Sequence, residues 1–113
     1  MKIAILGSRG FEDYKFFKKE VEKLGFEFDQ VISGGAVGAD TLARKYAREN
    51  GMMLTEVFPN YKKYHRSAPI RRNETIIKMA DFILFFWDFK SPGTKFGIDY
   101  AKKSGKEMKV VKV

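Results

Sequence analysis

Two short segments combine glycines, hydroxyl-bearing residues and an aspartate at points where a helix is about to begin. They are "VISGGAVGAD", residues 31–40, and "DFKSPGT", residues 88–94. The first backbone N–H groups of a helix lack partners and attract anions, and glycine lets an anion approach the backbone closely. Both segments therefore predict phosphate contacts. For the first, the structural alternative is a tight strand-to-helix turn with Asp40 as its cap or dipole partner.

The candidate contacts in these segments are backbone amides, hydroxyls and an aromatic ring. We expect one phosphate at the amides of Gly34, Gly35 and Gly38 with a hydroxyl from Ser33, and a second phosphate or a sugar at Ser91, Gly93 and Thr94. Trp87 and Asp88 end the apolar run before the second segment. They are candidates for stacking on a base and for binding a ribose hydroxyl, although Trp87 can equally close the edge of the core.

Five residues elsewhere in the chain complete the set of candidate ligand contacts. They are Gly7, Ser8, Arg9, Arg72 and Asn73. Arginine binds phosphate through two parallel hydrogen bonds, so Arg9 is expected to contact the ligand, with a surface role as its alternative. In "RRNETIIKMA", residues 71–80, the helical period places Arg72 and Asn73 nearer the sheet edge than Arg71. The alternative for Asn73 is a structural role in satisfying loop backbone.

Several chemistries are disfavoured by what the sequence lacks. It contains neither the Gly-x-Gly-x-x-Gly fingerprint nor a Gly-Lys-Ser/Thr loop, which argues against NAD dehydrogenases and P-loop NTPases. Cysteine is absent and His65 is the only histidine, so we expect no disulfide, no metal site and a surface position for His65. We also predict no cofactor, and no Ser-His-Asp or Cys-His set can be assembled.

An alternation of short β-branched runs with helical patterns predicts how the candidates are positioned. Strands are expected at residues 2–6, 30–33, 54–58, 81–88 and 109–113, and helices at 13–24, 39–50, 69–80 and 94–104. Residues 60–68 are expected to form a loop or a short irregular turn. This order predicts an α/β fold, a Rossmann-like three-layer α/β/α sandwich with a five-stranded parallel sheet, formed by residues 1–113 as one domain. Ligands of such sheets bind beyond the carboxyl ends of the strands, where the candidate loops fall.

Charge and hydropathy constrain the partners. Net charge is +8, and residues 61–113 hold thirteen Lys/Arg against five Asp/Glu, while residues 1–60 are balanced at nine each. A basic half favours an anionic partner, with a solvated C-terminal face as the alternative. No apolar run approaches the roughly 20 residues of a membrane span, so we expect a soluble, cytoplasmic protein with no membrane partner. Phe96 and Tyr100, four residues apart, predict an apolar patch on the last helix. Such a patch would be covered either by a second copy of the chain, in a homo-oligomer, or by a long crossover connection.

Four motifs together resemble a known family. "ILGSRGFEDY", "VISGGAVGAD", "RRN" ahead of "MADFILFFWD", and "SPGT" occur in the order and spacing of the YspA-type branch of the SLOG superfamily, long classed as a domain of unknown function. The superfamily includes the lysine-decarboxylase-like LOG phosphoribohydrolases, the DNA-processing protein A family and ligand-sensing domains of conflict systems. The resemblance implies a Rossmann-like fold and binding of a nucleotide or nucleotide-derived ligand at the two glycine segments.

The sequence departs from the LOG enzymes at one functional position. Those enzymes carry Pro-Gly-Gly-x-Gly-Thr-x-x-Glu, in which the glutamate is the acid/base for N-glycosidic cleavage. Here Pro92-Gly93-Thr94 is followed three positions later by Gly97, and Asp99 is the only nearby acid on that helix. The departure weakens any direct transfer of the LOG activity to this chain.

Three hypotheses of function remain open. The leading one is a module that senses, sequesters or processes a small nucleotide-like ligand. The second is an N-glycosidase acting on a nucleoside monophosphate, with Asp40, Asp88 or Asp99 as acid/base. The third, suggested by the basic second half with Tyr61, Tyr64 and Arg66, is a single-stranded nucleic-acid-binding protein. Under the leading hypothesis, Gly35→Asp is expected to abolish ligand binding without unfolding the domain.

Overall fold

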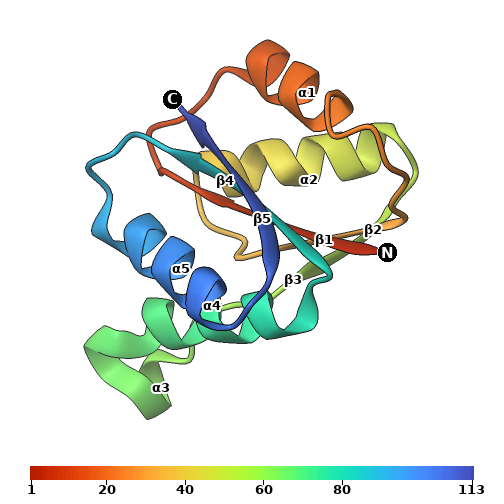
Figure 1. The fold of residues 1–113 in the computed structure, drawn as a ribbon. Helices are drawn as coiled ribbons and strands as arrows, with labels where there is room; N and C mark the ends of the chain where they lie inside the picture. The colour runs from red at the N-terminus through yellow and green to blue at the C-terminus, as the bar shows by residue number, and fades with distance from the viewer.

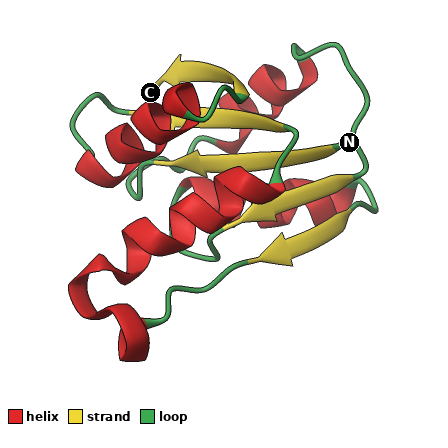
Figure 2. Cartoon of the chain, turned by 60° about the horizontal axis from the view of Figure 1, so that its bottom comes forward, coloured by secondary structure: helices red, strands yellow, loops and turns green.

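The computed structural model describes residues 1–113 as a five-stranded sheet with helices on both faces, as Figure 1 and Figure 2 show. The strands are β1 (Lys2–Gly7), β2 (Gln30–Ser33), β3 (Met53–Glu56), β4 (Phe82–Trp87) and β5 (Glu107–Lys112). All neighbouring pairs are parallel, and the order across the sheet is β3-β2-β1-β4-β5. The predicted three-layer sandwich with a five-stranded parallel sheet is confirmed.

The two faces of the sheet are covered by different helix pairs. Helices α1 (Tyr14–Glu22) and α2 (Ala39–Glu49) pack on one face, and α4 (Ala68–Met79) and α5 (Pro92–Lys103) pack on the other. Successive side chains of a strand point to opposite faces. In β1, Ile3 and Ile5 accordingly join the α1/α2 core, while Ala4 and Leu6 join the α4/α5 core. The unbroken apolar run of β4 is explained by burial on both faces.

The segment expected to be a loop or a short irregular turn contains short helical turns. Residues Tyr61–Tyr64 form α3, and His65–Ser67 form a 3-10 turn, η1, which leads directly into α4. The side chain of Asn60 caps α3 by accepting a hydrogen bond from the Lys63 N–H at 3.1 Å. Since α3 buries no residue, it leaves no apolar period in the sequence. Of the two alternatives, a short turn rather than a loop is what the structure has. None of the helices is both long and apolar enough to cross a membrane.

At one point in the sheet, the chain leaves two neighbouring parallel strands toward opposite faces. The chain passes from β1 to α1 on one face, whereas it passes from β4 to α5 on the other. The two strands end together, since Gly7 is in register with Phe86 and the Ser8 N–H donates to the Phe86 carbonyl at 2.9 Å. Loops that diverge in this way leave a space beyond the carboxyl ends of β1 and β4.

Candidate functional site

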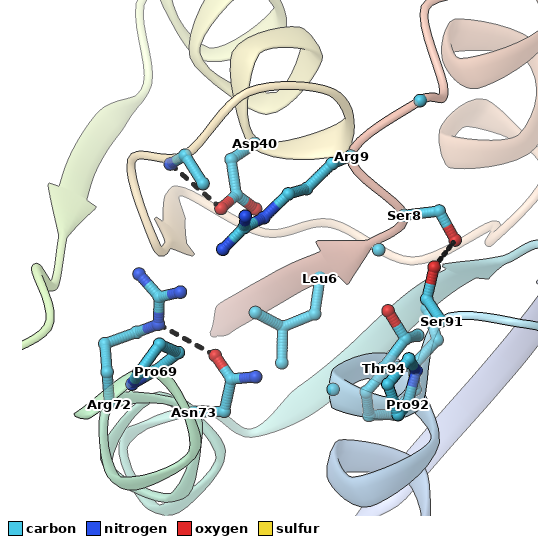
Figure 3. A pocket seen from close by; sticks show the side chains of 15 residues that line it. Leu6, Ser8, Arg9, Asp40, Pro69, Arg72, Asn73, Ser91, Pro92 and Thr94 are labelled. Atoms are coloured by element: carbon cyan, nitrogen blue, oxygen red, sulfur yellow. Dashed lines mark hydrogen bonds between the residues drawn. The ribbon is translucent and has the colours of Figure 1, made fainter. Parts of the chain in front are cut away.

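A cavity of about 420 Å³ opens at this point, as Figure 3 shows. Its wall comes from the β1–α1 loop, the glycine segment before α2, and the first turns of α4 and α5. Nine of the predicted contacts line it, namely Gly7, Ser8, Arg9, Asp40, Arg72, Asn73, Ser91, Gly93 and Thr94. The remaining predicted contacts, Ser33, Gly34, Gly35, Gly38, Trp87 and Asp88, lie outside its wall.

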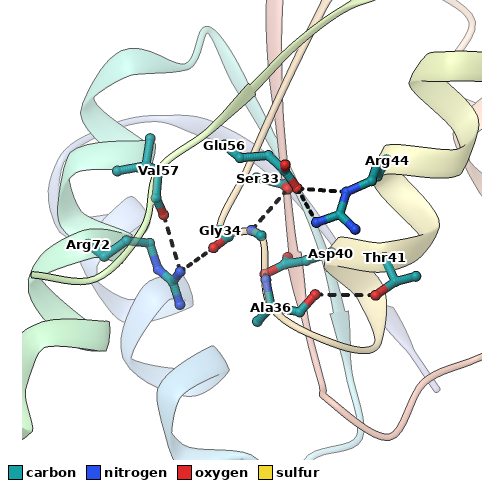
Figure 4. A network of polar contacts seen from close by, with 10 residues as sticks. Ser33, Gly34, Ala36, Asp40, Thr41, Arg44, Glu56, Val57 and Arg72 are labelled. Atoms are coloured by element: carbon teal, nitrogen blue, oxygen red, sulfur yellow. Dashed lines mark hydrogen bonds and ion pairs between the residues drawn. The ribbon is translucent and has the colours of Figure 1, made fainter.

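Arg72 reaches from α4 to the ends of β2 and β3. Its Nη1 donates to the Gly34 carbonyl at 2.6 Å and to the Val57 carbonyl at 3.2 Å (Figure 4). Its Nε donates to Asn73 Oδ1 at 2.8 Å (Figure 3). Burial lowers the pKa of the Arg72 guanidinium, the charge of Asp40 opposes that shift, and the charge of Arg9 adds to it. Arg9 and Arg72 both extend into the cavity in Figure 3. An anion between them would relieve their mutual repulsion.

Asp40 is the only acidic side chain in the cavity wall. It is 6% exposed, and its Oδ2 accepts a hydrogen bond from the Ala36 N–H at 3.1 Å. Its Oδ1 is buried and has no hydrogen-bond partner. Burial raises the pKa of Asp40, although the Ala36 N–H and the charge of Arg72 oppose the shift. A buried carboxylate oxygen without a hydrogen-bond donor is costly to keep ionised.

The glycines before α2 make room for protein groups. A Cβ on Gly34 would overlap the Arg72 guanidinium and lie 2.9 Å from Asp40 Oδ2, so the absent side chain lets both groups approach. Gly38 has a φ of 78°, and a Cβ there would lie 2.5 Å from the Ser8 carbonyl oxygen. The segment is thereby packed against the β1–α1 loop. These two glycines position the cavity wall without lining it.

Gly35 and Ser33 also serve the turn itself. Ser33 is fully buried, and its Oγ accepts a hydrogen bond from the Gly35 N–H at 3.4 Å. A Cβ on Gly35 would lie 2.5 Å from Cε1 of Phe58, whose ring covers this glycine outside the cavity. An aspartate at Gly35 would therefore meet Phe58 rather than a ligand in the cavity. This is a correction to the expectation that Gly35→Asp directly tests the phosphate contact.

The first turn of α5 is open to the cavity. Its N-cap Ser91 makes no side-chain capping bond, and the first N–H of the turn to bond within the protein is that of Lys95, to the Ser91 carbonyl at 3.2 Å. The amides of Gly93 and Thr94 line the cavity and donate to no protein acceptor. A Cβ on Gly93 would meet nothing within 4 Å. This helix start has both the free donors and the space that an anion needs.

Asp88 and Trp87 hold the loop that carries Ser91. Asp88 Oδ1 accepts from the Lys90 N–H at 2.9 Å and the Ser91 N–H at 2.8 Å, and its Oδ2 lies 3.1 Å from Ser91 Oγ. These hydrogen bonds, that of the Ser91 N–H foremost, lower the pKa of Asp88 to about 2. Trp87 Nε1 donates to the Ser91 carbonyl at 3.1 Å, and Ser91 Oγ lies 3.2 Å from Ser8 Oγ. Both residues thus position Ser91 from outside the cavity wall.

One proposed acid/base lies away from the cavity, and some lining residues were missed. Asp99 pairs with Lys95 at 2.8 Å on the exposed side of α5, with 58% of its side chain exposed. The lining residues not predicted are Leu6, Gly10, Ala36, Pro69, Phe85 and Pro92. Leu6 and Phe85 are paired near the carboxyl ends of β1 and β4, and that position, where ligands of parallel sheets bind, was a signal that could have indicated them.

Comparison with known proteins adds two findings. Residues 1–64, more than half of the chain, match the YspA, cpYpsA-related SLOG family. The fold is similar to that of DNA processing protein A from Helicobacter pylori, whose structure was solved to explain its single-stranded DNA binding mode, with a TM-score of 0.73 and 21% identity. The match covers 97% of this chain but 64% of that one, less than two thirds, and at this identity it shows the fold alone. The sequence matches none of the curated proteins compared with it.

Proposed function

The chain belongs to the YspA, cpYpsA-related SLOG family, and from that premise we propose that it binds a nucleotide or nucleotide-derived ligand in the cavity beyond β1 and β4. One observation carries the proposal: the same cavity holds two guanidinium groups, an open helix start, and a buried carboxylate oxygen that lacks a donor. A phosphate alone would use the guanidinium groups and the helix start but not the carboxylate. A sugar phosphate would use all three, because a sugar hydroxyl can donate to the carboxylate.

The phosphate binds at the first turn of α5 in this proposal. The amides of Gly93 and Thr94 donate to it, because they have no protein acceptor and the helix dipole favours an anion there. The hydroxyl of Ser91 uses its only proton on Asp88 Oδ2, so Ser91 positions the loop while the two amides bind the phosphate. Arg9 reaches the phosphate from the opposite side of the cavity as a charge-assisted donor.

The sugar binds at Asp40 in this proposal. Asp40 Oδ1 accepts a hydrogen bond from a ribose hydroxyl, which supplies the donor that this buried oxygen lacks. Arg72 stays nearby to compensate the carboxylate charge, since each lowers the cost of burying the other. The single-stranded DNA binding described for the Helicobacter pylori protein is compatible with this site, because a strand end presents phosphate and sugar groups of the same kind.

Isothermal titration calorimetry with matched ligands tests the proposal. We expect a nucleoside monophosphate to bind at least tenfold more tightly than its nucleoside and than inorganic phosphate, since only the monophosphate uses both halves of the cavity. Arg9→Gln is expected to weaken monophosphate binding about tenfold, as loss of a hydrogen bond to a charged group costs roughly 1.5–3 kcal/mol. The nucleoside affinity should not change.

The control variant is Arg48→Gln, which removes an exposed arginine near the end of α2 that does not line the cavity. It should leave both affinities unchanged. Equal binding of nucleoside and monophosphate, or equal effects of Arg9→Gln and Arg48→Gln, would contradict a phosphate site in this cavity.

A second candidate function, cleavage of the N-glycosidic bond of the bound nucleotide, is favoured by Asp40. Its raised pKa suits a carboxyl group that donates a proton to the departing base. Water then adds to the sugar carbon and gives its proton to the Asp40 carboxylate, which restores the acid and yields free base and sugar phosphate. Chromatography after incubation with nucleoside monophosphates tests it. Cleavage that Asp40→Asn abolishes supports the hydrolase, whereas nucleotides recovered intact argue for binding alone.

A further inference from the structure

A second hollow, of about 330 Å³, lies on the other side of Arg72 from the cavity. It is formed by the end of β3, α3 and the flank of α4. Arg72 lines both spaces, so the two are neighbours separated by one side chain. Along α4, Pro69 and Asn73 face the cavity, while Arg71, Thr75 and Lys78 face the second hollow. Arg72, which bridges α4 to the carbonyls of Gly34 and Val57, therefore stands between the two spaces.

The second hollow presents aromatic rings to solvent. The side chain of Phe58 is 64% exposed and that of Tyr64 is 37% exposed, although both are large and apolar in part. Phe58 lies over Gly35, whose absent side chain makes room for the ring. Exposed rings of this kind serve as stacking platforms for bases, and stacking does not depend on base identity.

The second hollow is also positively charged. Its lining includes Arg71, Arg72 and Lys78 against one acid, Glu74. Arg71 is paired with Glu74 at 3.2 Å, whereas Lys78 forms no ion pair. Asn60 and Thr75 add polar groups to the same wall. Aromatic rings beside Lys78, the one cation of this wall without an acidic partner, are complementary to a nucleotide, which has a flat base and an anionic phosphate.

We propose that the second hollow is a subsite for a second nucleotide, so that the natural ligand contains at least two nucleotide units joined by a phosphodiester. This inference rests on the proposed function of the cavity. The second base stacks on Phe58 and Tyr64. The linking phosphate lies at Arg72 between the two spaces, and Lys78, in the wall of the second hollow, is the second cation for that phosphate.

Calorimetry with ligands of increasing length tests the subsite. The probes are a nucleoside 5′-monophosphate, a 5′-phosphorylated dinucleotide and a 5′-phosphorylated hexanucleotide of the same base. We expect the dinucleotide to bind at least tenfold more tightly than the monophosphate, since stacking of one base on an aromatic side chain contributes roughly 1–3 kcal/mol. No further gain with the hexanucleotide identifies a small dinucleotide ligand, and a further gain identifies a single strand; either result supports the subsite.

Variants of residues that line the second hollow test whether the additional affinity for the dinucleotide arises there. Tyr64→Ala and Lys78→Ala are each expected to remove most of the dinucleotide gain without changing monophosphate affinity, because neither residue lines the cavity. Tyr64→Phe keeps the ring and should keep the gain. Lys102→Ala, which removes an exposed lysine near the end of α5, is the charge control and should have no effect.

The outcomes separate the two proposals. Binding of the monophosphate with no gain for the dinucleotide overturns the subsite and leaves the proposed function standing. A gain that survives both Tyr64→Ala and Lys78→Ala also overturns the subsite, because the extra contact then lies elsewhere. Failure of all three probes to bind overturns the proposed function, and the subsite with it.

Discussion

The glycine segments before α2 and before α5 have the same sequence pattern but different structures. Before α2, the Ala36 N–H donates to Asp40 and the Gly35 N–H donates to Ser33 Oγ, so the segment is closed by the protein's own oxygens. Before α5, the amides of Gly93 and Thr94 donate to no protein acceptor and line the cavity. One pattern thus produces a closed turn in one place and an open anion site in the other.

The position of the aspartate explains the difference. Asp40 is the second residue of α2, and its side chain turns back onto the amide of Ala36, four residues earlier. Asp88 precedes α5 by four residues, and its side chain is used by the amides of Lys90 and Ser91 before the helix begins. Asp40 thus closes the loop ahead of α2, and the Ala39 N–H of the first turn donates to the Ser8 carbonyl at 3.4 Å, whereas no protein oxygen accepts from the amides of Gly93 and Thr94.

The largest expected effect is that of Gly93→Asp. A carboxylate at this open position would occupy the anion site and repel a phosphate, and two like charges about 4 Å apart repel by roughly 4 kcal/mol near a protein surface. We expect nucleotide affinity to fall at least 100-fold in calorimetry, with the melting temperature little changed because a Cβ there has free space.

Two variants make that result specific. Gly93→Asn has nearly the same shape without the charge, so it should weaken binding much less. Gly35→Asp places the same charge against Phe58, outside the cavity, and should also weaken binding less than Gly93→Asp. If Gly35→Asp weakened nucleotide binding more than Gly93→Asp, the phosphate would have to bind at the segment before α2 and not at the start of α5.

Gly34→Ala comes next in size. The new methyl group would overlap the Arg72 guanidinium and crowd Asp40, so Arg72 must move from its hydrogen bonds to Gly34 and Val57. We expect the free energy of unfolding in urea to fall by roughly 1–3 kcal/mol, as for overpacking elsewhere, and nucleotide affinity to fall about tenfold. Gly10→Ala is the control, since a Cβ on Gly10 meets nothing within 4 Å; equal losses in both would show that crowding at Arg72 is irrelevant.

Asp40→Asn should separate stability from binding. Because the folded-state pKa of Asp40 is raised, the folded protein binds this proton more tightly than the unfolded chain, and its stability falls as pH rises from the ordinary aspartate pKa of 3.8 through the folded pKa. Asparagine avoids that cost. At neutral pH we expect a melting temperature a few degrees higher and weaker nucleotide binding. A melting temperature clearly below that of the wild type would argue that the carboxylate stabilises the free protein.

The smallest effect is expected for Asp88→Asn, measured in thermal melts from pH 2 to 7. The pKa of Asp88 is lowered from 3.8 to about 2, so its stabilising contribution is fully present above pH 3.8 and is lost as pH falls through about 2. The variant should melt slightly below the wild type at neutral pH, and the difference should vanish near pH 2. A difference that is the same at both ends of this range would exclude the ionised carboxylate as its cause.

The sequence predicted the fold closely because its signals are local. The unbroken apolar run of β4 indicated a strand buried on both faces, and Ala39, Leu42 and Ala43 indicated the buried side of α2, where the structure has them. The short helix α3 was not distinguished from a loop because it is fully solvated and buries no side chain. The resemblance to the SLOG family was confirmed by the match over residues 1–64.

The order of strands and helices, the parallel sheet and the edge where the candidate loops gather follow from the sequence alone. Hydrophobic period and connection length are local properties, and they restrict the chain to few topologies. Only the tertiary structure decided which glycine segment is open and which predicted residues share one cavity. Those features depend on contacts between distant residues, such as Arg72 with the carbonyl of Gly34, 38 positions earlier, and on burial that leaves Asp40 Oδ1 without a donor. No local pattern encodes either.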